Sequence, residues 1–157
     1  MQEVTLDIPI SADVAIVWQD DRLYLLDQRQ LPTREVFIEC PDVRSTAEAI
    51  RAMVVRGAPA IGITAAYGVV LAARARHARN PADWRAAVES DLTLLAASRP
   101  TAVNLVWAIA RVRTLLAGPG DGDPVPSLLT EATGIHRQDR VDNQRMGEFG
   151  AGLIQGP

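Results

Sequence analysis

The stretch of this 157-residue chain with the clearest capacity for chemistry is Arg56-Gly57-Ala58-Pro59. Pro59 suits the first position of a helix, because the N–H that proline lacks would have no helical partner there. The unpaired amides and the positive dipole end at such a helix start favour an anion. The Arg56 guanidinium would add a charge-assisted contact to a phosphate or carboxylate. These residues predict an anion site, although a tight interhelical turn with a solvated arginine fits the same pattern.

A second arginine has a similar setting. Arg99 precedes Pro100 at the point where one predicted helix ends and another begins, with Thr101 as the expected N-cap. Its guanidinium could meet an anion held at the start of that helix, and the alternative is a surface arginine. The two arginines would form one site only if the fold brings their turns together.

The histidines add no chemistry. His77 lies in a basic run that suits a solvated helix end, and His136 lies on a late helix. Neither has a partner at metal-ligand spacing, and no nucleophile elbow, phosphate-binding glycine loop or paired carboxylate site is found. The chain thus offers anion-binding arginines without an acid, base or nucleophile. It is either a binding module or part of an active site completed elsewhere, and we expect no metal and no cofactor.

Composition limits the class of protein. The length of 157 residues fits one domain with a core, or one domain plus part of another. The chain is 48% hydrophobic and 22% charged, as in an ordinary soluble protein, and its net charge of -3 argues against a nucleic-acid partner. The single cysteine, Cys40, alternates with Val36 and Ile38, so we expect a buried strand residue and no disulfide framework. No signal peptide follows Met1, and the apolar run 60–73 is too short to span a bilayer. We therefore expect a cytoplasmic protein without a membrane partner.

Period-two alternation in the first forty residues predicts strands of a small antiparallel sheet, with a turn at Asp20-Asp21 and a break at Leu31-Pro32-Thr33. The alternating residues are Val4, Leu6, Ile8 and Ile10, then Val14, Ile16 and Trp18, then Leu23 and Leu25, and finally Val36, Ile38 and Cys40, with Phe37 on the opposite face to the last three.

The remainder of the chain predicts helices. A Ser45-to-Glu48 capping box should begin a short helix that stops near Gly57, and a helix that is apolar on nearly every side should follow and be buried. Asn80-Pro81-Ala82-Asp83 should begin a third helix, whose apolar line is Trp84, Val88, Leu92 and Leu95. A fourth should span about 102–116, with Val103, Val106, Trp107, Ala110 and Val112 supplying much of its apolar surface.

Residues 118–127 are rich in glycine and proline and predict a flexible loop. One long helix, or two broken near Gly134, should follow it. The predicted fold is therefore α+β, with antiparallel strands in 1–42 and a mainly helical bundle in 43–157, together forming one domain.

Four stretches match the pattern of a known family and together cover nearly the whole chain. They are Leu25-Leu26-Asp27-Gln28 with Leu31-Pro32-Thr33, then residues 53–62, 99–105 and 143–151. In these stretches the chain resembles the methylthioribose-1-phosphate isomerases. The resemblance implies an aldose–ketose isomerase of methionine salvage, converting 5-methylthioribose 1-phosphate to 5-methylthioribulose 1-phosphate without a metal.

The resemblance also implies site residues. In that family the Arg-Gly-Ala segment and the arginine of the Arg-Pro-Thr motif contact the sugar phosphate, which carries over to Arg56, Gly57, Ala58 and Arg99. The family's catalytic cysteine and aspartate belong to a second, Rossmann-like domain, so Cys40 is not that cysteine. Family members are about twice this length and pair as homodimers. We therefore expect an N-terminal domain whose last helix leads toward an absent α/β domain, and which alone does not turn over substrate.

Two alternatives remain within the same superfamily. Regulatory subunits of a translation initiation exchange factor are assembly proteins rather than enzymes, and ribose 1,5-bisphosphate isomerase acts on a different sugar phosphate. Intact arginine motifs favour the isomerase reading, because an interaction subunit has no need of two phosphate-facing arginines.

Overall fold

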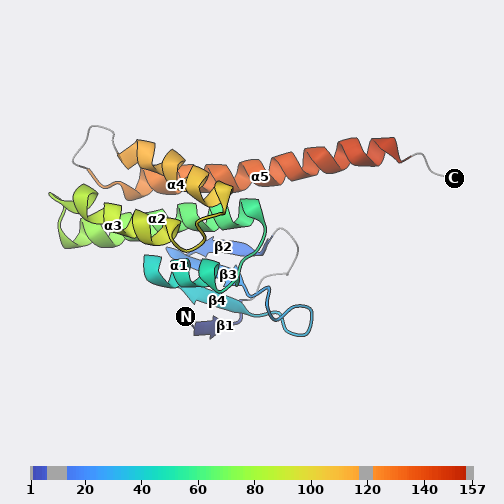
Figure 1. Ribbon diagram of the computed structural model, residues 1–157, viewed down its shortest axis with the longest axis horizontal. Coiled ribbons are helices and arrows are strands. Elements are labelled where there is room, and N and C mark those ends of the chain that lie inside the picture. Colours follow the sequence, from blue (N-terminus) through green and yellow to red (C-terminus); the bar gives the residue numbers. More distant parts are fainter. Residues whose placement is uncertain (1, 7–13, 117–121, 155–157) are drawn as a thin grey trace.

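The computed structural model describes residues 2–6, 14–116 and 122–154, and in these ranges a four-stranded sheet precedes five helices (Figure 1). The strands are β1 (Gln2–Val4), β2 (Ile16–Gln19), β3 (Arg22–Leu26) and β4 (Phe37–Cys40). The helices are α1 (Val43–Arg51), α2 (Ala58–Arg79), α3 (Trp84–Ala96), α4 (Val103–Leu116) and α5 (Val125–Leu153). This order confirms the predicted α+β fold.

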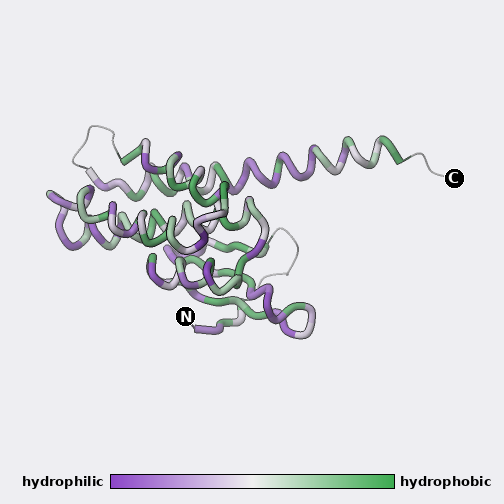
Figure 2. Tube along the Cα trace, viewed as in Figure 1, coloured by the Kyte–Doolittle hydropathy of each residue, from purple (hydrophilic) through white to green (hydrophobic). Residues whose placement is uncertain are grey.

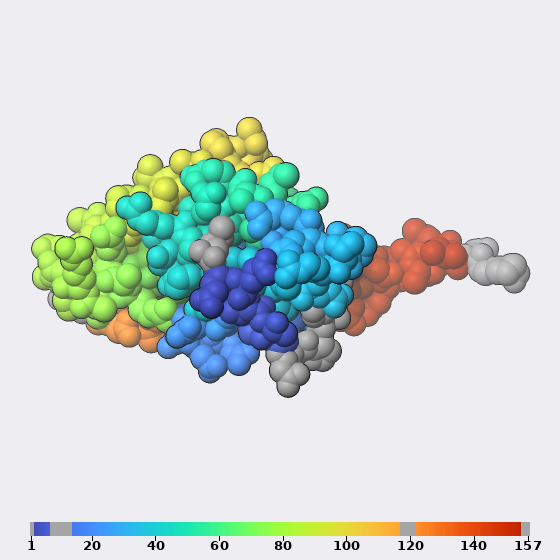
Figure 3. Space-filling view, turned by 90° about the horizontal axis from the view of Figure 1, so that it is seen from below, coloured from blue at the N-terminus to red at the C-terminus, as the bar shows by residue number. Residues whose placement is uncertain are grey.

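The sheet is antiparallel throughout and has the order β1-β4-β3-β2. Asp20 and Asp21, both with positive φ (50° and 59°), form the predicted turn between β2 and β3. Cys40 is fully buried in β4, as expected, while Phe37 is buried on the face opposite the main core. The expected strand positions Ile8 and Ile10 lie outside the described residues. Seen from below, the blue strands form one side of the molecule (Figure 3).

Helix α2 forms the centre of the molecule. Its residues 61–73 are all buried, and it packs against the other four helices and against β2. The predicted burial is confirmed. The length was underestimated, because α2 has 22 residues. It contains an 18-residue apolar window with a mean hydropathy of 1.4, enough by length and composition alone to cross a membrane. Since 72% of that apolar window is buried inside the protein, a core helix accounts for its hydropathy.

The start of α1 differs from the prediction. Asp42, rather than Ser45, is the N-cap: its carboxylate accepts from the Ser45 backbone N–H (2.7 Å), and the Ser45 hydroxyl accepts from the Asp42 N–H (3.2 Å). Aspartate is among the residues preferred at an N-cap. Ser45, three residues after Asp42, makes the reciprocal hydrogen bond that Glu48 was expected to make to Ser45.

Helix α3 buries the predicted line, but α4 presents a different face to the core. Its buried residues are Leu105, Ala108, Ile109, Val112 and Leu116. Of the five residues predicted to supply apolar surface, Val112 is buried, whereas Val103, Val106, Trp107 and Ala110 are exposed, Val103 at 77% and Trp107 at 47%. The helix has apolar residues on two faces, and the face that packs against α2 is the buried one.

Helix α5 is one continuous helix that includes Gly134, and it begins at Val125, so residues 125–127 of the predicted loop are helical. The earlier loop residues 118–121 lie outside the described ranges. Leu128, Ala132 and Ile135 are its buried residues, and from residue 140 onward the helix projects beyond the body (Figures 1 and 3). Hydrophilic and hydrophobic stretches alternate along this exposed part (Figure 2).

Candidate anion site at the starts of α2 and α4

The segment that carries Arg56 begins with a tight ending of α1. The Val54 N–H donates to the Ala49 carbonyl (2.9 Å) and the Met53 N–H donates to the Ile50 carbonyl (3.2 Å). With Met53 at φ 59°, these two bonds form a Schellman motif. The first helix therefore ends at Arg51, with Ala52 as its C-cap, rather than near Gly57, where the sequence predicted its end. Val54 and the next residue are buried and fix the start of the segment.

Gly57 instead caps the following helix. It has φ 91° and ψ 136°, a region that residues with a Cβ rarely adopt, and no atom lies within 4 Å of where its Cβ would be. Ala58 is the first helical residue and Pro59 the second, one position later than predicted. No side chain caps this end, and all three residues are exposed, so the free first-turn amides face solvent.

Arg56 is exposed and lies against the end of β3. Its Nη2 donates to the Gln28 carbonyl (3.3 Å), and the Gln28 N–H donates to the Val54 carbonyl (3.0 Å). In the sequence, Gln28 stands out only as part of a stretch that matches the family pattern, and nothing there gives it a role. A backbone carbonyl that orients an arginine leaves no signature in the side chain, so the sequence could not reveal this contact.

A buried carboxylate supports this strand end. Asp27 is 0% exposed and accepts from Arg29 Nε (2.7 Å) and Nη2 (2.8 Å) and from Gln30 Nε2 (2.9 Å). The Arg29 guanidinium is the main reason that the pKa of Asp27 falls from its ordinary 3.8 to about 2. The ionised carboxylate thus fixes the residue next to Gln28.

Arg99 lies in the turn between α3 and α4 and is half-buried. Its carbonyl accepts from the Ala102 N–H (2.9 Å), and the Ala102 carbonyl accepts from Val106 (3.3 Å) in the first α-helical bond of α4. Thr101 therefore lies one residue outside the cap position predicted for it. The Arg99 turn still precedes the start of α4 directly, as expected.

The fold brings the two turns to the same end of the helical layer. A Cβ added at Gly62 would lie 2.8 Å from the Asn104 carbonyl oxygen, so the first turns of α2 and α4 are in backbone contact. Figure 1 shows both helices starting at the end from which α5 projects. Pro59 and Asn104 also line one cavity of about 230 Å³. The sequence-predicted Arg56, Gly57, Ala58 and Arg99 therefore lie in the turns that precede two helices whose starts approach each other.

The wall that α5 contributes to this cavity is acidic. Asp139 and Asp142 line it, and they accept hydrogen bonds from Asn143 (3.1 Å) and Gln138 (2.8 Å). Two carboxylates disfavour an anion inside the cavity. The favourable position for an anion is therefore outside it, at the exposed helix starts.

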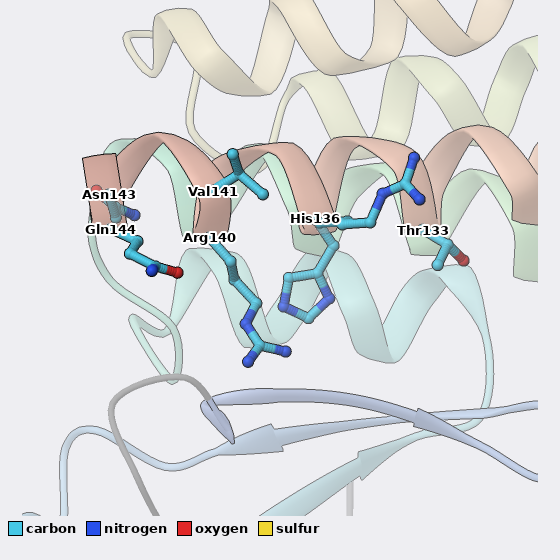
Figure 4. Close-up of a pocket in the computed structure, with 7 residues that line it drawn as sticks. Thr133, His136, Arg140, Val141, Asn143 and Gln144 are labelled. Carbon is cyan, nitrogen blue, oxygen red and sulfur yellow. The ribbon is translucent and has the colours of Figure 1, made fainter. Parts of the chain in front are cut away.

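A larger cavity of about 690 Å³ lies on another side of α5 (Figure 4). His136 and Arg140 point into it. His136 Nδ1 is 3.3 Å from the hydroxyl oxygen of Tyr67, and the Tyr67 ring stacks on Trp18. Burial, with Arg140 as a lesser cause, lowers the pKa of His136. His136 therefore ties α5 to α2 as a structural residue, and this cavity includes neither arginine of the candidate site.

Unlike the two arginine turns, the side chains that could serve as metal ligands or nucleophiles are not gathered at one place in the described ranges. In the described ranges, no three or more His, Cys, Asp or Glu side chains gather as a metal site. Burial raises the pKa of the Cys40 thiol to about 12, which removes it as a nucleophile. The exposed helix starts and the two arginines suit an anion, and the described residues of this region include no evident acid–base pair.

Comparison with known proteins gives the chain its family. It is 56% identical over 140 residues to the methylthioribose-1-phosphate isomerase of Alkalilimnicola ehrlichii, and 58% identical over 142 residues to that of Pseudomonas syringae pv. syringae. These matches cover 89% and 90% of this chain but only 40% and 39% of the relatives. The chain thus spans about two fifths of their length.

Two solved structures share the fold. The 5-methylthioribose 1-phosphate isomerase of Pyrococcus horikoshii OT3 superposes with a TM-score of 0.83 at 33% identity, over 89% of this chain and 40% of that one. The translation initiation factor eIF-2B subunit delta of A. fulgidus gives 0.81 at 38% identity, over 90% and 42%. The model of the initiation factor 2 subunit family matches residues 54–156. The match begins just before the Arg56 segment and includes the Arg99 turn, and this chain belongs to the initiation factor 2 subunit family.

Proposed function

We propose that this chain is the substrate-positioning part of an aldose–ketose isomerase that converts 5-methylthioribose 1-phosphate to 5-methylthioribulose 1-phosphate in methionine salvage. The observation that carries the proposal is the backbone contact between the first turns of α2 and α4, which places the Arg56 and Arg99 turns at one end of the helical layer. The relatives that are more than half identical, and that bear this activity in their names, support the choice of substrate.

Each residue has a role in the proposed complex. Arg56 and Arg99 neutralise the phosphate dianion, and the free amides at the start of α2 donate to its oxygens. Gly57 lets the ligand approach the backbone because no Cβ stands over that turn. Holding one end of the substrate in this way lowers the entropic cost of reaction for the groups that act at the other end.

Opening of the sugar ring and hydrogen transfer between C1 and C2 need acid–base groups. The candidate site does not supply them, and the relatives have about 60% of their length outside the matched region, which leaves room for a second domain. We therefore propose that the 157 residues bind substrate without turnover. We further propose that the complete enzyme is a cytoplasmic homodimer.

A second candidate function is a regulatory or assembly subunit related to translation initiation factors. The observation in its favour is the likeness to the eIF-2B delta subunit of A. fulgidus, whose 38% identity exceeds the 33% of the isomerase structure. The exposed apolar side chains of α4, Val103, Val106 and Trp107, suit protein contact as well. A subunit of this kind would not need Arg56 and Arg99 for its assembly.

Titration of the protein with 5-methylthioribose 1-phosphate, followed by amide NMR shifts, separates these functions. The isomerase proposal expects saturable shifts at Gly57, Ala58 and the start of α4, and weaker binding of ribose 1,5-bisphosphate. Tighter binding of the bisphosphate would make ribose 1,5-bisphosphate the assigned substrate. Absence of shifts with both sugar phosphates would favour the assembly subunit. Turnover of the substrate by the 157 residues alone would contradict the positioning role.

A further inference from the structure

A groove at the opposite end of α2 gathers positive charge. Its volume is about 290 Å³, and it lies between the start of α1 and the last turns of α2. Four arginines line it, Arg44, Arg74, Arg76 and Arg79, which we call the arginine groove. Two aspartates accompany them, so the lining carries two more positive than negative charges in a chain whose net charge is -3.

Two of these arginines are held in place by the protein. Arg76 donates through Nε (2.7 Å) and Nη2 (2.9 Å) to Asp91, whose side chain is only 8% exposed. This pair uses one edge of the guanidinium and leaves Nη1 for another acceptor. Arg74 lies 3.9 Å from Asp21 and 5.9 Å from the centre of the Trp18 ring. The groove therefore has fixed donors on the α2 side.

The other two arginines have a different character. Arg44 and Arg79 are exposed, and in the described ranges neither guanidinium makes a side-chain hydrogen bond or a close ion pair. The backbone N–H and the charge of Arg44 do act on the neighbouring Asp42 carboxylate. The dipole of α2 accounts for Arg79 near its C-terminus, but Arg44 lies in the first turn of α1, where a cation is unfavourable. Asp42, at that helix start, caps the helix through Ser45 and offsets the charge of Arg44 only in part. An anion in the groove would relieve the repulsion among these arginines.

We propose that the arginine groove binds a small phosphomonoester, at a second site distinct from the starts of α2 and α4. A phosphate carries the charge opposite to that of the arginine-rich lining, and its three terminal oxygens accept more of the guanidinium donors than a carboxylate does. Val43, Leu71 and Ala72 also line the groove and suit the carbon part of the ester. Arg74 is 16 residues beyond Ala58, so the helical rise puts the sites about 24 Å apart.

Phenyl phosphate is the probe, titrated into the protein in phosphate-free buffer and followed by amide shifts of α1's first turn and α2's last turn. Replacing Arg44 and Arg79 together by glutamine removes two exposed cations, and should weaken binding at these amides at least about tenfold. Arg51→Gln is the matched control, because Arg51 is an exposed arginine of α1 that contacts Glu48 instead. It should leave the affinity unchanged.

Arg99→Ala separates this site from the proposed substrate site. The proposal expects this variant to keep phenyl phosphate binding in the arginine groove, whether or not the sugar phosphate binds elsewhere. Two results would overturn the proposal of a second site. One is amide shifts confined to Gly57, Ala58 and the start of α4. The other is equal affinity in the parent and in the Arg44→Gln/Arg79→Gln protein.

Discussion

At the scale of single residues, the groups that orient the candidate site are less conspicuous than the groups that would touch a ligand. The sequence identifies Arg56 and Arg99 by their charge and by the prolines that follow them. It does not identify the Gln28 carbonyl that accepts from Arg56, nor the buried Asp27 beside it, because both act through contacts between distant segments. Such contacts follow only from the folded chain.

Asp27 gives a prediction for acid stability. Its folded pKa, about 2, lies below its ordinary 3.8, so the ionised group stabilises the protein above about pH 4, and this contribution is lost as the pH falls from 4 toward 2. Asp27→Asn should cost about 2 kcal/mol at pH 7, because hydrogen bonds from Arg29 to a charged acceptor are lost. Urea unfolding measured from pH 7 to pH 2 checks both effects.

The control is Glu48→Gln, which removes an exposed ion pair with Arg51 and should change stability by less than about 1 kcal/mol. If the Asn variant lost as much stability on acidification as the parent, Asp27 would not be the titrating group.

Cys40 gives a prediction for thiol reactivity. The side chain is 0% exposed and burial raises its pKa to about 12, so almost no thiolate is present at pH 8. An aromatic disulfide reagent should label it rapidly in 6 M guanidinium chloride and extremely slowly in the native protein. Native labelling at the denatured rate would show that β4 is not covered as described.

At the scale of elements, the sequence predicts types better than ends and faces. Period-two alternation in β3 and β4 and the largely apolar run of α2 are strong signals, and both were confirmed. The cap of α1 was wrong because Asp42 and Ser45 are both good caps three residues apart. The inward face of α4 could not be predicted because Val106 and Trp107 are as apolar as the residues that are buried. Local pattern cannot choose between two such faces.

The contact between α2 and α4 predicts opposite effects for two glycines. Gly62→Ala would place a Cβ 2.8 Å from the Asn104 carbonyl, and backbone there can yield only if the helices separate. It should destabilise the protein by about 1–3 kcal/mol and weaken sugar-phosphate binding. Gly134→Ala in α5 meets no atom within 4 Å and should stabilise by about 0.5–1 kcal/mol.

Thermal and urea unfolding of the two variants measure this difference directly. Equal stability for Gly62→Ala and the parent would mean that α2 and α4 are not in backbone contact, and the shared location of the two arginine turns would lose its support.

At the scale of the whole molecule, α2 connects two regions of positive charge. The Arg56 and Arg99 turns lie at its start and the arginine groove lies at its end, while the body between them is one hydrophobic core. The sequence supplied both arginine motifs, and the resemblance to a family supplied their role. That the motifs lie together depends on how α4 packs along α2, which the sequence did not show.

The most direct test of the central claim is titration of 5-methylthioribose 1-phosphate into the parent protein and into Arg56→Ala and Arg99→Ala, with Arg113→Ala as an exposed control arginine paired with Glu89. Two arginines on one phosphate should each matter, so each variant should lose at least about tenfold in affinity while the control keeps it. Undiminished binding in either variant would contradict a single site formed by both turns.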